Sequence, residues 1–168
     1  TAPGCDGAAM PGHLVLVGLM GAGKSTVGRR CAERLGRPFV DTDEEVERVA
    51  GRPVAAVFAD EGESGFRIRE REAVAAVAGA PDPLVIACGG GAVLDPANRA
   101  ALRAGGTVVW LRAPVSELAA RVGTGEGRPL LGGNPVDALS RLERERADSY
   151  GAAADVVVDT EGLAVDEA

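Results

Sequence analysis

The chain has 168 residues, of which 46% are hydrophobic and 26% charged, as expected for one folded domain rather than a disordered chain. Its formal net charge of −7 argues against nucleic acid or an anionic membrane surface as the main partner. No apolar run approaches the roughly 20 residues that span a bilayer. We therefore expect a cytoplasmic, monomeric protein with a disordered leader over 1–12 and a single domain over 13–168.

Short apolar segments alternate with helical patterns along the whole chain. Such alternation predicts a parallel sheet with helices on both faces, which is a three-layer α/β/α fold. Because only 3% of the residues are aromatic, the core has to be built from Val, Leu, Ile and Ala. Strands are predicted at 13–18, 38–42, 84–88, 107–111 and 155–159. Helices are predicted at 24–35, 43–50, 53–60, 64–79, 96–104, 115–122 and 136–150.

The segment GLMGAGKST, residues 18–26, follows the first predicted strand and fits the pattern G-x-x-x-x-G-K-[ST]. Glycines in this pattern let backbone N–H groups point into one concavity at the start of a helix, where anions are favoured. Lys24 is expected to reach the outer phosphates and the Ser25 hydroxyl to ligate Mg²⁺. A chance match would be a plain glycine-rich turn, but the flanking strand and helix favour a site for a nucleoside triphosphate.

Two acids close the second predicted strand. Asp41 and Asp43 lie where an open parallel sheet binds ligands, and on extended chain they point to different sides. One can then assist a metal through water while the other accepts a hydrogen bond from an attacking hydroxyl. Either acid can equally cap the next helix, whose first turn contains Glu44 and Glu45. The local sequence leaves both interpretations open.

The segment GESGFRIRERE, residues 62–72, is rich in charge on one predicted helix. Such a run is usually a solvated helix face with pairs such as Glu63–Arg67 and Arg67–Glu70. Phe66, however, lies next to Arg67, which places that arginine near the boundary of the core.

Two glycine-rich segments follow. CGGGAV, residues 88–93, comes after the third predicted strand and is either a tight turn or bare backbone that a ligand can approach. RVGTGEGRPLLGGNP, residues 121–135, holds Arg121 and Arg128 in a stretch that favours neither helix nor strand. Taken alone, this second stretch is a loop.

Taken together, these segments resemble shikimate kinase. GLMGAGKST, DTD, FADEGESGFRIRE, GGGAV, GRPLL and RADSY occur in the order of that family, between about His13 and Thr160. The resemblance implies phosphorylation of the 3-hydroxyl of shikimate with ATP and Mg²⁺, a step towards chorismate and the aromatic amino acids. It also implies a P-loop kinase fold with strand order 2-3-1-4-5, a mobile lid at about 122–136 and substrate-binding helices at about 43–79.

On the nucleotide side, the resemblance implies that Arg121 lies against the adenine and that Arg128 reaches the transferred phosphate from the lid. Mg²⁺ would be bound by Ser25 and, through water, by Asp41. Lys24 and Arg128 are two of the three expected catalytic residues. The phosphates of ATP would be held by six consecutive residues: Gly21, Ala22, Gly23, Lys24, Ser25 and Thr26.

On the acceptor side, the resemblance implies that Asp43 binds the reacting shikimate hydroxyl and is the third catalytic residue, a candidate base. Arg67 and Arg146 would grip the shikimate carboxylate, and Glu70 would orient Arg67. Arginine suits this task because its guanidinium binds carboxylates through paired N–H groups. Backbone contacts would come from three glycines: Gly89, Gly90 and Gly91.

Two alternatives compete with this function. One is another small-molecule kinase of the same fold, acting on gluconate or a nucleoside monophosphate; the other is a non-catalytic relative that binds nucleotide or shikimate. The GRPLL segment and the separate Arg67 and Arg146 favour shikimate, and the presence of every acceptor residue favours turnover. The chain departs from many relatives after the last strand, where it has DTEGLA (159–164) in place of an arginine near the adenine, and its final helix is short or missing.

Overall fold

The structure of the protein is a computed structural model that describes residues 11–123 and 133–168. Residues 1–10 of the expected leader lie outside the described residues, as do most of the expected lid and its Arg128.

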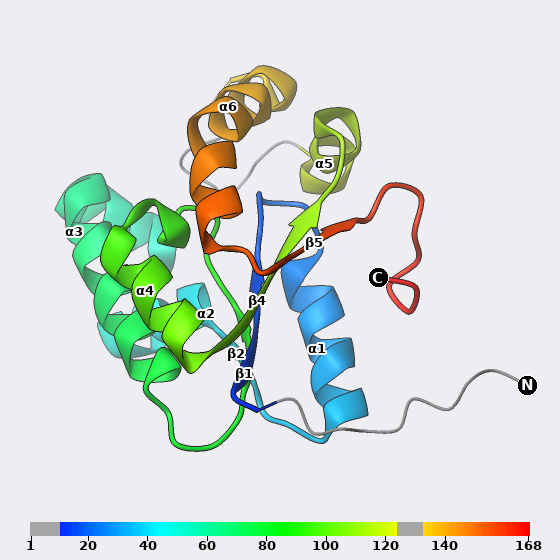
Figure 1. Ribbon diagram of the computed structural model, residues 1–168. Helices are drawn as coiled ribbons and strands as arrows, with labels where there is room; N and C mark the ends of the chain where they lie inside the picture. Colours follow the sequence, from blue (N-terminus) through cyan, green and yellow to red (C-terminus); the bar gives the residue numbers. More distant parts are fainter. Residues whose placement is uncertain (1–10, 124–132) are drawn as a thin grey trace, which may run out of the picture.

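Five parallel strands form one sheet in the order β2-β3-β1-β4-β5 (Figure 1). This order confirms the predicted 2-3-1-4-5 arrangement. The central strand is buried along its whole length, and its Leu14 pairs with Val85 on one side and Thr107 on the other. The strands are β1 (His13–Val17), β2 (Phe39–Asp41), β3 (Val85–Ala87), β4 (Gly106–Arg112) and β5 (Val156–Asp159).

Helices cover both faces of the sheet, as predicted. Figure 1 shows α1 on one face and the pair α3 and α4 on the other, with α5 and α6 beyond one end of the strands. The helices are α1 (Lys24–Leu35), α2 (Thr42–Ala50), α3 (Val54–Ala78), α4 (Pro96–Gly105), α5 (Val115–Val122) and α6 (Pro135–Ala153), with a short 3₁₀-helix, η1 (Ala92–Leu94).

The region predicted as two helices, 53–60 and 64–79, is the helical element α3, in which two helices meet across a kink. The kink is at Gly62, whose φ of 70° and ψ of −178° are not helical. A positive φ is accessible to glycine at little cost, so this residue lets the chain end one helix and begin the next. The prediction of two helices divided between residues 60 and 64 is therefore confirmed.

The core is aliphatic, as the low aromatic content predicts. Strands β1 and β3 bury Val, Leu, Ile and Ala side chains, and Tyr150 is one of the few aromatic side chains among them, at 1% exposed. The single histidine, His13, is buried and structural: its Nδ1 accepts from the Leu84 N–H at 3.0 Å, and its Nε2 donates to the Ala78 carbonyl at 3.2 Å. The histidine therefore ties the start of β1 to the segment before β3.

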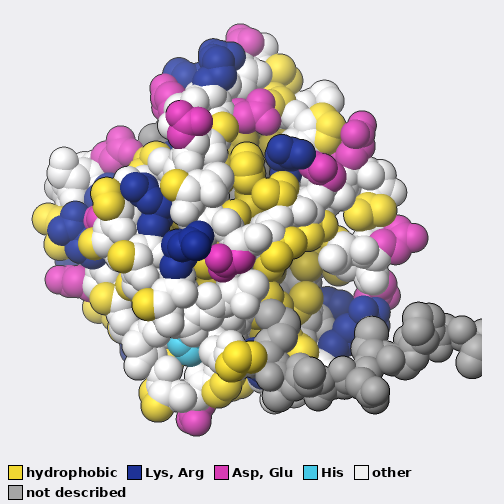
Figure 2. Space-filling model, viewed as in Figure 1, with side chains coloured by type: hydrophobic (Ala, Val, Ile, Leu, Met, Phe, Trp, Pro, Cys, Tyr) yellow, Lys and Arg dark blue, Asp and Glu magenta, His cyan; other side chains and the backbone are white. Residues whose placement is uncertain are grey.

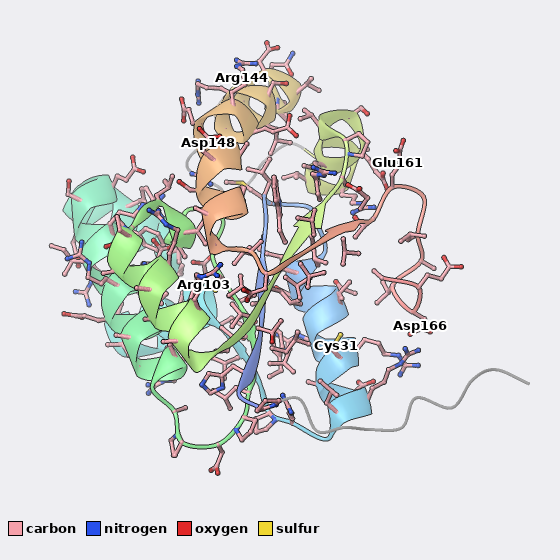
Figure 3. The ribbon with its side chains drawn as sticks, viewed as in Figure 1. Cys31, Arg103, Arg144, Asp148, Glu161 and Asp166 are labelled. Carbon is pink, nitrogen blue, oxygen red and sulfur yellow. The ribbon has the colours of Figure 1, made fainter. Side chains whose placement is uncertain are left out.

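The chain after β5 runs back beside α1. From residue 160 to 168 it forms turns rather than a helix, as the departure from the family pattern indicated. Asp166 forms an ion pair with Arg30 of α1 at 2.6 Å (Figure 3). The edge strand β5 leaves Val156 and Val157 nearly half exposed. Figure 2 shows hydrophobic side chains gathered across the middle of one face of the molecule, over β4 and β5. None of the helices in the described parts of the chain is long and apolar enough to cross a membrane.

Candidate active site

A cleft of about 660 Å³ lies at the carboxyl ends of β1, β2 and β3. This is the edge at which open α/β sheets bind ligands. Nearly every predicted site residue in the described part of the chain lines it; the exception is Ala22, which is only 2% exposed beneath the phosphate loop. The predicted residues that line the cleft are Gly21, Gly23, Lys24, Ser25, Thr26, Asp41, Asp43, Arg67, Glu70, Gly89, Gly90, Gly91, Arg121 and Arg146.

The phosphate loop connects β1 to the first turn of α1. Gly21 and Gly23 have φ angles of 80° and 88°, which favour glycine, and a Cβ at Gly21 would lie 2.9 Å from the Leu118 carbonyl oxygen. The Lys24 ammonium group donates to the Leu19 carbonyl at 2.9 Å. The loop is thus folded into a concavity at a helix N-terminus, which is a preformed site for phosphate.

Asp41 caps α2, which is one of the two roles that the sequence left open, and it also contacts the phosphate loop. Its Oδ1 accepts from the Asp43 N–H at 2.9 Å and caps α2, while its Oδ2 accepts from the Ser25 hydroxyl at 2.7 Å. A serine hydroxyl and a carboxylate are oxygen ligands of the kind that Mg²⁺ prefers. Because Mg²⁺ usually combines one or two protein oxygens with phosphate and water, this pair fits the ion.

Asp43 lies in the first turn of α2 rather than on extended chain. The prediction that the two acids diverge by strand alternation was therefore wrong in its reason, because the cap by Asp41 starts the helix at Thr42. The buried Asp43 Oδ1 has no hydrogen-bond partner among the described residues. Burial, together with the charges of Asp41 and Glu70, raises the pKa of Asp43 to about 6, against the opposing effect of Lys24 and Arg67. A carboxyl group of this kind is suited to accept a proton near neutral pH.

Arg67 is held on α3 by two carboxylates. Its Nη1 donates to Glu70 Oε2 at 2.7 Å and its Nη2 to Glu63 Oε1 at 3.2 Å, as the helical spacing predicted. The guanidinium also lies 5.3 Å from the centre of the Phe66 ring. Glu70 is only 1% exposed, and its burial raises its pKa although Arg67 acts in the opposite direction. The second carboxylate oxygen, Glu70 Oε1, is buried without a hydrogen-bond partner in the described structure.

Arg146 comes from α6, on the other side of the cleft, and is only 2% exposed. Its Nη1 is buried and finds no hydrogen-bond acceptor in residues 11–123 or 133–168. An unsatisfied charged donor away from water carries a large desolvation cost. An anionic ligand in the cleft, such as a carboxylate or a phosphate, would remove that cost.

The three glycines 89–91, here called the glycine triplet, link β3 to η1. None of them needs a positive φ, so their role is to leave space rather than to allow an unusual backbone. A Cβ at Gly89 would lie 2.5 Å from Asp43 Oδ1 and 2.9 Å from Glu70 Oε1. Glycine at this position therefore admits both acids to the floor of the cleft.

The other two glycines make room for the arginines. A Cβ at Gly90 would lie 3.2 Å from Arg146 Nη1, and one at Gly91 would lie 2.5 Å from Arg67 Nη1. Consecutive glycines thus face one arginine from α6 and one from α3. The interpretation of this segment as ligand-facing backbone rather than a simple turn agrees with its position on the cleft.

Arg121 is in the last turn of α5 and faces the phosphate loop. It donates to the Gly21 carbonyl at 3.0 Å and forms an ion pair with Glu117. It also lines the cleft, beyond the loop from the two acids. Its predicted partner on the nucleotide side, Arg128, is not among the described residues.

Two aromatic residues of α3 line the cleft and were not among the predicted site residues. The rings of Phe58 and Phe66 are 4.7 Å apart between centroids and give the cleft an apolar wall. A signal was present in the sequence, because phenylalanine is rare in this chain: there are three, and two of them, eight positions apart, flank the stretch ADEGESG at 59–65. A ligand here meets carboxylates, guanidinium groups and an apolar surface together.

Comparisons with known proteins agree with this geometry. A family model described as shikimate kinase matches residues 20–168. The shikimate kinase of Symbiobacterium thermophilum is 55% identical over 153 residues, which cover 89% of this chain and 87% of that protein. That of Moorella thermoacetica is 49% identical over 153 residues, which cover 91% of this chain and 87% of the relative.

Solved structures give the same result. The shikimate kinase from Acinetobacter baumannii in complex with shikimate has a TM-score of 0.89 and 40% identity, over 92% of this chain and 87% of that one. A gluconokinase from Sinorhizobium meliloti reaches a TM-score of 0.55 at 24% identity, over 94% of this chain and 87% of its own, which is a likeness of fold alone. The chain therefore belongs to the shikimate kinase family.

Proposed function

We propose that the protein transfers the γ-phosphoryl group of ATP to the 3-hydroxyl of shikimate and so forms shikimate 3-phosphate for chorismate and aromatic amino-acid biosynthesis. The observation that carries the proposal is the arrangement around the glycine triplet. A buried arginine from α6 and a second one from α3 face adjacent glycines, and a buried carboxylate faces the first of the three. Such a floor suits a compact ligand that has one carboxylate and a reactive hydroxyl.

The nucleotide half of the mechanism belongs to the phosphate loop. Its backbone N–H groups and Lys24 would hold the β- and γ-phosphates in line with the acceptor. Ser25 and, through water, Asp41 would hold Mg²⁺, which neutralises phosphate charge when it is bound. Arg121 would lie against the adenine, and Arg128 would contact the transferred phosphate from the lid.

The acceptor half belongs to α2, α3 and α6. Arg67 and Arg146 would bind the shikimate carboxylate, with Glu70 fixing the orientation of Arg67 through the 2.7 Å hydrogen bond. Asp43 would accept the proton of the attacking hydroxyl, for which its raised pKa is favourable. Because phosphoryl transfer depends mainly on positioning and positive charge, no covalent intermediate is needed.

The same proposal covers the organisation of the protein. Residues 13–168 would form one kinase domain, with substrate-binding helices at about 43–79 and a lid at about 122–136, most of which lies outside the described residues. Both halves of the cleft come from one chain, which supports action as a monomer, and the net charge of −7 supports the absence of nucleic acid or a membrane among its partners. A cytoplasmic location is part of the proposal.

Acceptor identity is tested by measuring ADP release with shikimate, gluconate and AMP offered separately. We expect Mg²⁺-dependent turnover with shikimate and none above background with the other two. Gluconate is a flexible open chain and AMP contains a nucleoside, so neither presents a carboxylate and a hydroxyl in the fixed geometry of the shikimate ring. Turnover with gluconate or AMP but not with shikimate would contradict the proposal. Binding of shikimate without any ADP release would instead support the non-catalytic alternative.

Replacing Arg67 by alanine should raise the KM for shikimate about 10-fold or more and leave the KM for ATP nearly unchanged. The reason is that a hydrogen-bonded charge pair contributes roughly 1.5–3 kcal/mol. The matched control is Arg71→Ala, which removes an arginine of the same helix that is 62% exposed and pairs with Asp95. Steady-state kinetics check both variants. A rise confined to the KM for ATP would place the carboxylate site elsewhere.

Replacing Asp43 by asparagine should abolish most turnover yet stabilise the metal-free protein. Because folding raises the pKa of Asp43 from 3.8 to about 6, the ionised form destabilises the folded state, and this cost develops as the pH rises from about 4 to 6. Above pH 6 we expect the free energy of unfolding of the variant to exceed that of the parent protein by about 2 kcal/mol. This is less than the full pKa shift implies, because solvent reaches part of the side chain. At pH 4 we expect little difference between the two proteins.

Denaturant unfolding at pH 4, 5.5 and 7.5 measures this gain, and ADP release should fall at least about 100-fold. The control Asp148→Asn removes an exposed carboxylate of α6 and should show no such pH-dependent gain (Figure 3). Unchanged kcat would remove Asp43 from the catalytic residues. A stability gain that is the same at all three pH values would show that Asp43 is not destabilised by its ionisation.

Replacing Gly91 by alanine should raise the KM for shikimate several-fold because the new methyl group would displace the Arg67 guanidinium, 2.5 Å away at Nη1. Gly151→Ala is the control: it lies in α6, where a Cβ would meet no neighbouring group within 4 Å, so it should be neutral or slightly stabilising. Steady-state kinetics and thermal melts compare the two. Equal KM values for shikimate would show that the triplet is not part of the carboxylate site.

A further inference from the structure

Two buried hydroxyl groups bond to the backbone of the glycine triplet. The Gly89 N–H donates to Thr42 Oγ1 at 2.9 Å, and the Tyr150 hydroxyl donates to the Gly90 carbonyl. Thr42 is fully buried and Tyr150 is 1% exposed. The two hydroxyls come from α2 and α6, so they hold adjacent residues of the triplet from two different elements.

The triplet needs such support because glycine has the most freedom of any residue and no side chain to anchor it. Its ends are already fixed: the Cys88 N–H bonds to the Leu16 carbonyl in the sheet, and the Gly91 carbonyl accepts from Leu94 in η1. Between these points the backbone passes close to two acids and two arginines, so a displacement of the triplet would change its spacing from these groups. The hydroxyl bonds act on this middle part.

Each hydroxyl is also rigidly linked to proposed substrate-binding groups. Thr42 lies between Asp41 and Asp43 at the start of α2. The same turn therefore holds Asp41, which is proposed to assist Mg²⁺, the Thr42 hydroxyl that bonds to Gly89, and Asp43, the candidate base. Tyr150 lies four residues after Arg146, on the same face of α6, and its ring packs against Trp110 at 5.4 Å between centroids. Burial raises the pKa of Tyr150 to about 12, so its hydroxyl remains a donor at neutral pH.

We propose that Thr42 and Tyr150 are positioning residues of the acceptor site, which hold the glycine triplet at the spacing that shikimate requires between Asp43 and the two arginines. The proposal rests on the proposed function, because it assigns these two residues to the acceptor half of the same site. Neither touches the reacting atoms. They act through the backbone that the substrate meets.

The kinetic test uses Thr42→Val and Tyr150→Phe, which remove one hydroxyl each with little change of shape. We expect the KM for shikimate to rise about fivefold or more in both, from the loss of one buried hydrogen bond, and the KM for ATP to stay within about twofold. Thr42→Ser keeps the hydroxyl and should restore the KM for shikimate. The control Thr160→Val removes a buried hydroxyl that donates to the Arg112 carbonyl at 3.2 Å, beside β4 and β5. This variant should leave the KM for shikimate unchanged.

A second measurement is independent of activity. In protein labelled with ¹⁵N-glycine, hydrogen exchange of the Gly89 amide should become at least about 10-fold faster in Thr42→Val. The amide shift of Gly91, whose peptide unit contains the Gly90 carbonyl, should change in Tyr150→Phe. Thr160→Val should leave both signals unchanged. Should Thr42→Val fail to fold, Tyr150→Phe carries both tests alone.

The possible outcomes separate the two proposals. If the parent protein does not phosphorylate shikimate, the proposed function fails, and exchange at Gly89 still decides whether the hydroxyls hold the triplet. If exchange and shifts change as expected but the KM for shikimate does not, the positioning role is overturned. An effect on the KM for ATP alone, or unchanged signals in folded variants, overturns it as well.

Discussion

The site depends on the absence of three side chains. Residues 89–91 have no Cβ atoms, and the space so left is filled by Asp43 and Glu70 at one end and by Arg146 and Arg67 at the other. Groups from three helices therefore converge on a few ångströms of backbone at the end of β3. A Cβ at any of the three positions would lie within 3.2 Å of one of these charged groups, so the arrangement of the cleft depends on a packing constraint.

A second consequence is electrostatic. The residues that converge on the triplet include three buried polar atoms without hydrogen-bond partners in the described structure: Asp43 Oδ1, Glu70 Oε1 and Arg146 Nη1. Such atoms destabilise the protein without a ligand, because no hydrogen bond offsets the free-energy cost of removing them from water. A substrate with a carboxylate and hydroxyls would supply an acceptor for the arginine and donors for the acids. Its binding would therefore offset part of this desolvation cost.

Much of this arrangement could be predicted from the sequence, and the limits have identifiable causes. The phosphate loop between β1 and α1 was predictable because its glycines and Lys24 have a fixed spacing with a known physical purpose. The pairing of Arg67 with Glu70 was predictable from helical spacing alone. Strand order came only through the resemblance, since alternating strands and helices specify a parallel sheet without specifying which strands are neighbours.

Other features depend on contacts between distant segments. Asp41 both caps α2 and accepts from Ser25, and a single carboxylate with two partners cannot be assigned from a local pattern. Thr42 and Tyr150 are separated by 108 positions in the sequence numbering, and only the fold shows that they bond to the same triplet. From the sequence alone, Phe58 and Phe66 are ordinary candidates for the core. In the fold, the bend at Gly62 places both on the cleft wall.

Calorimetric titration of the protein with shikimate and with its methyl ester measures whether the two arginines at the triplet recognise a carboxylate. The two ligands share the ring and all three hydroxyls and differ in the charge that Arg67 and Arg146 would bind. We expect one shikimate site per chain and an affinity for the ester at least about 10-fold lower. Equal affinities for the acid and the ester would contradict this expectation.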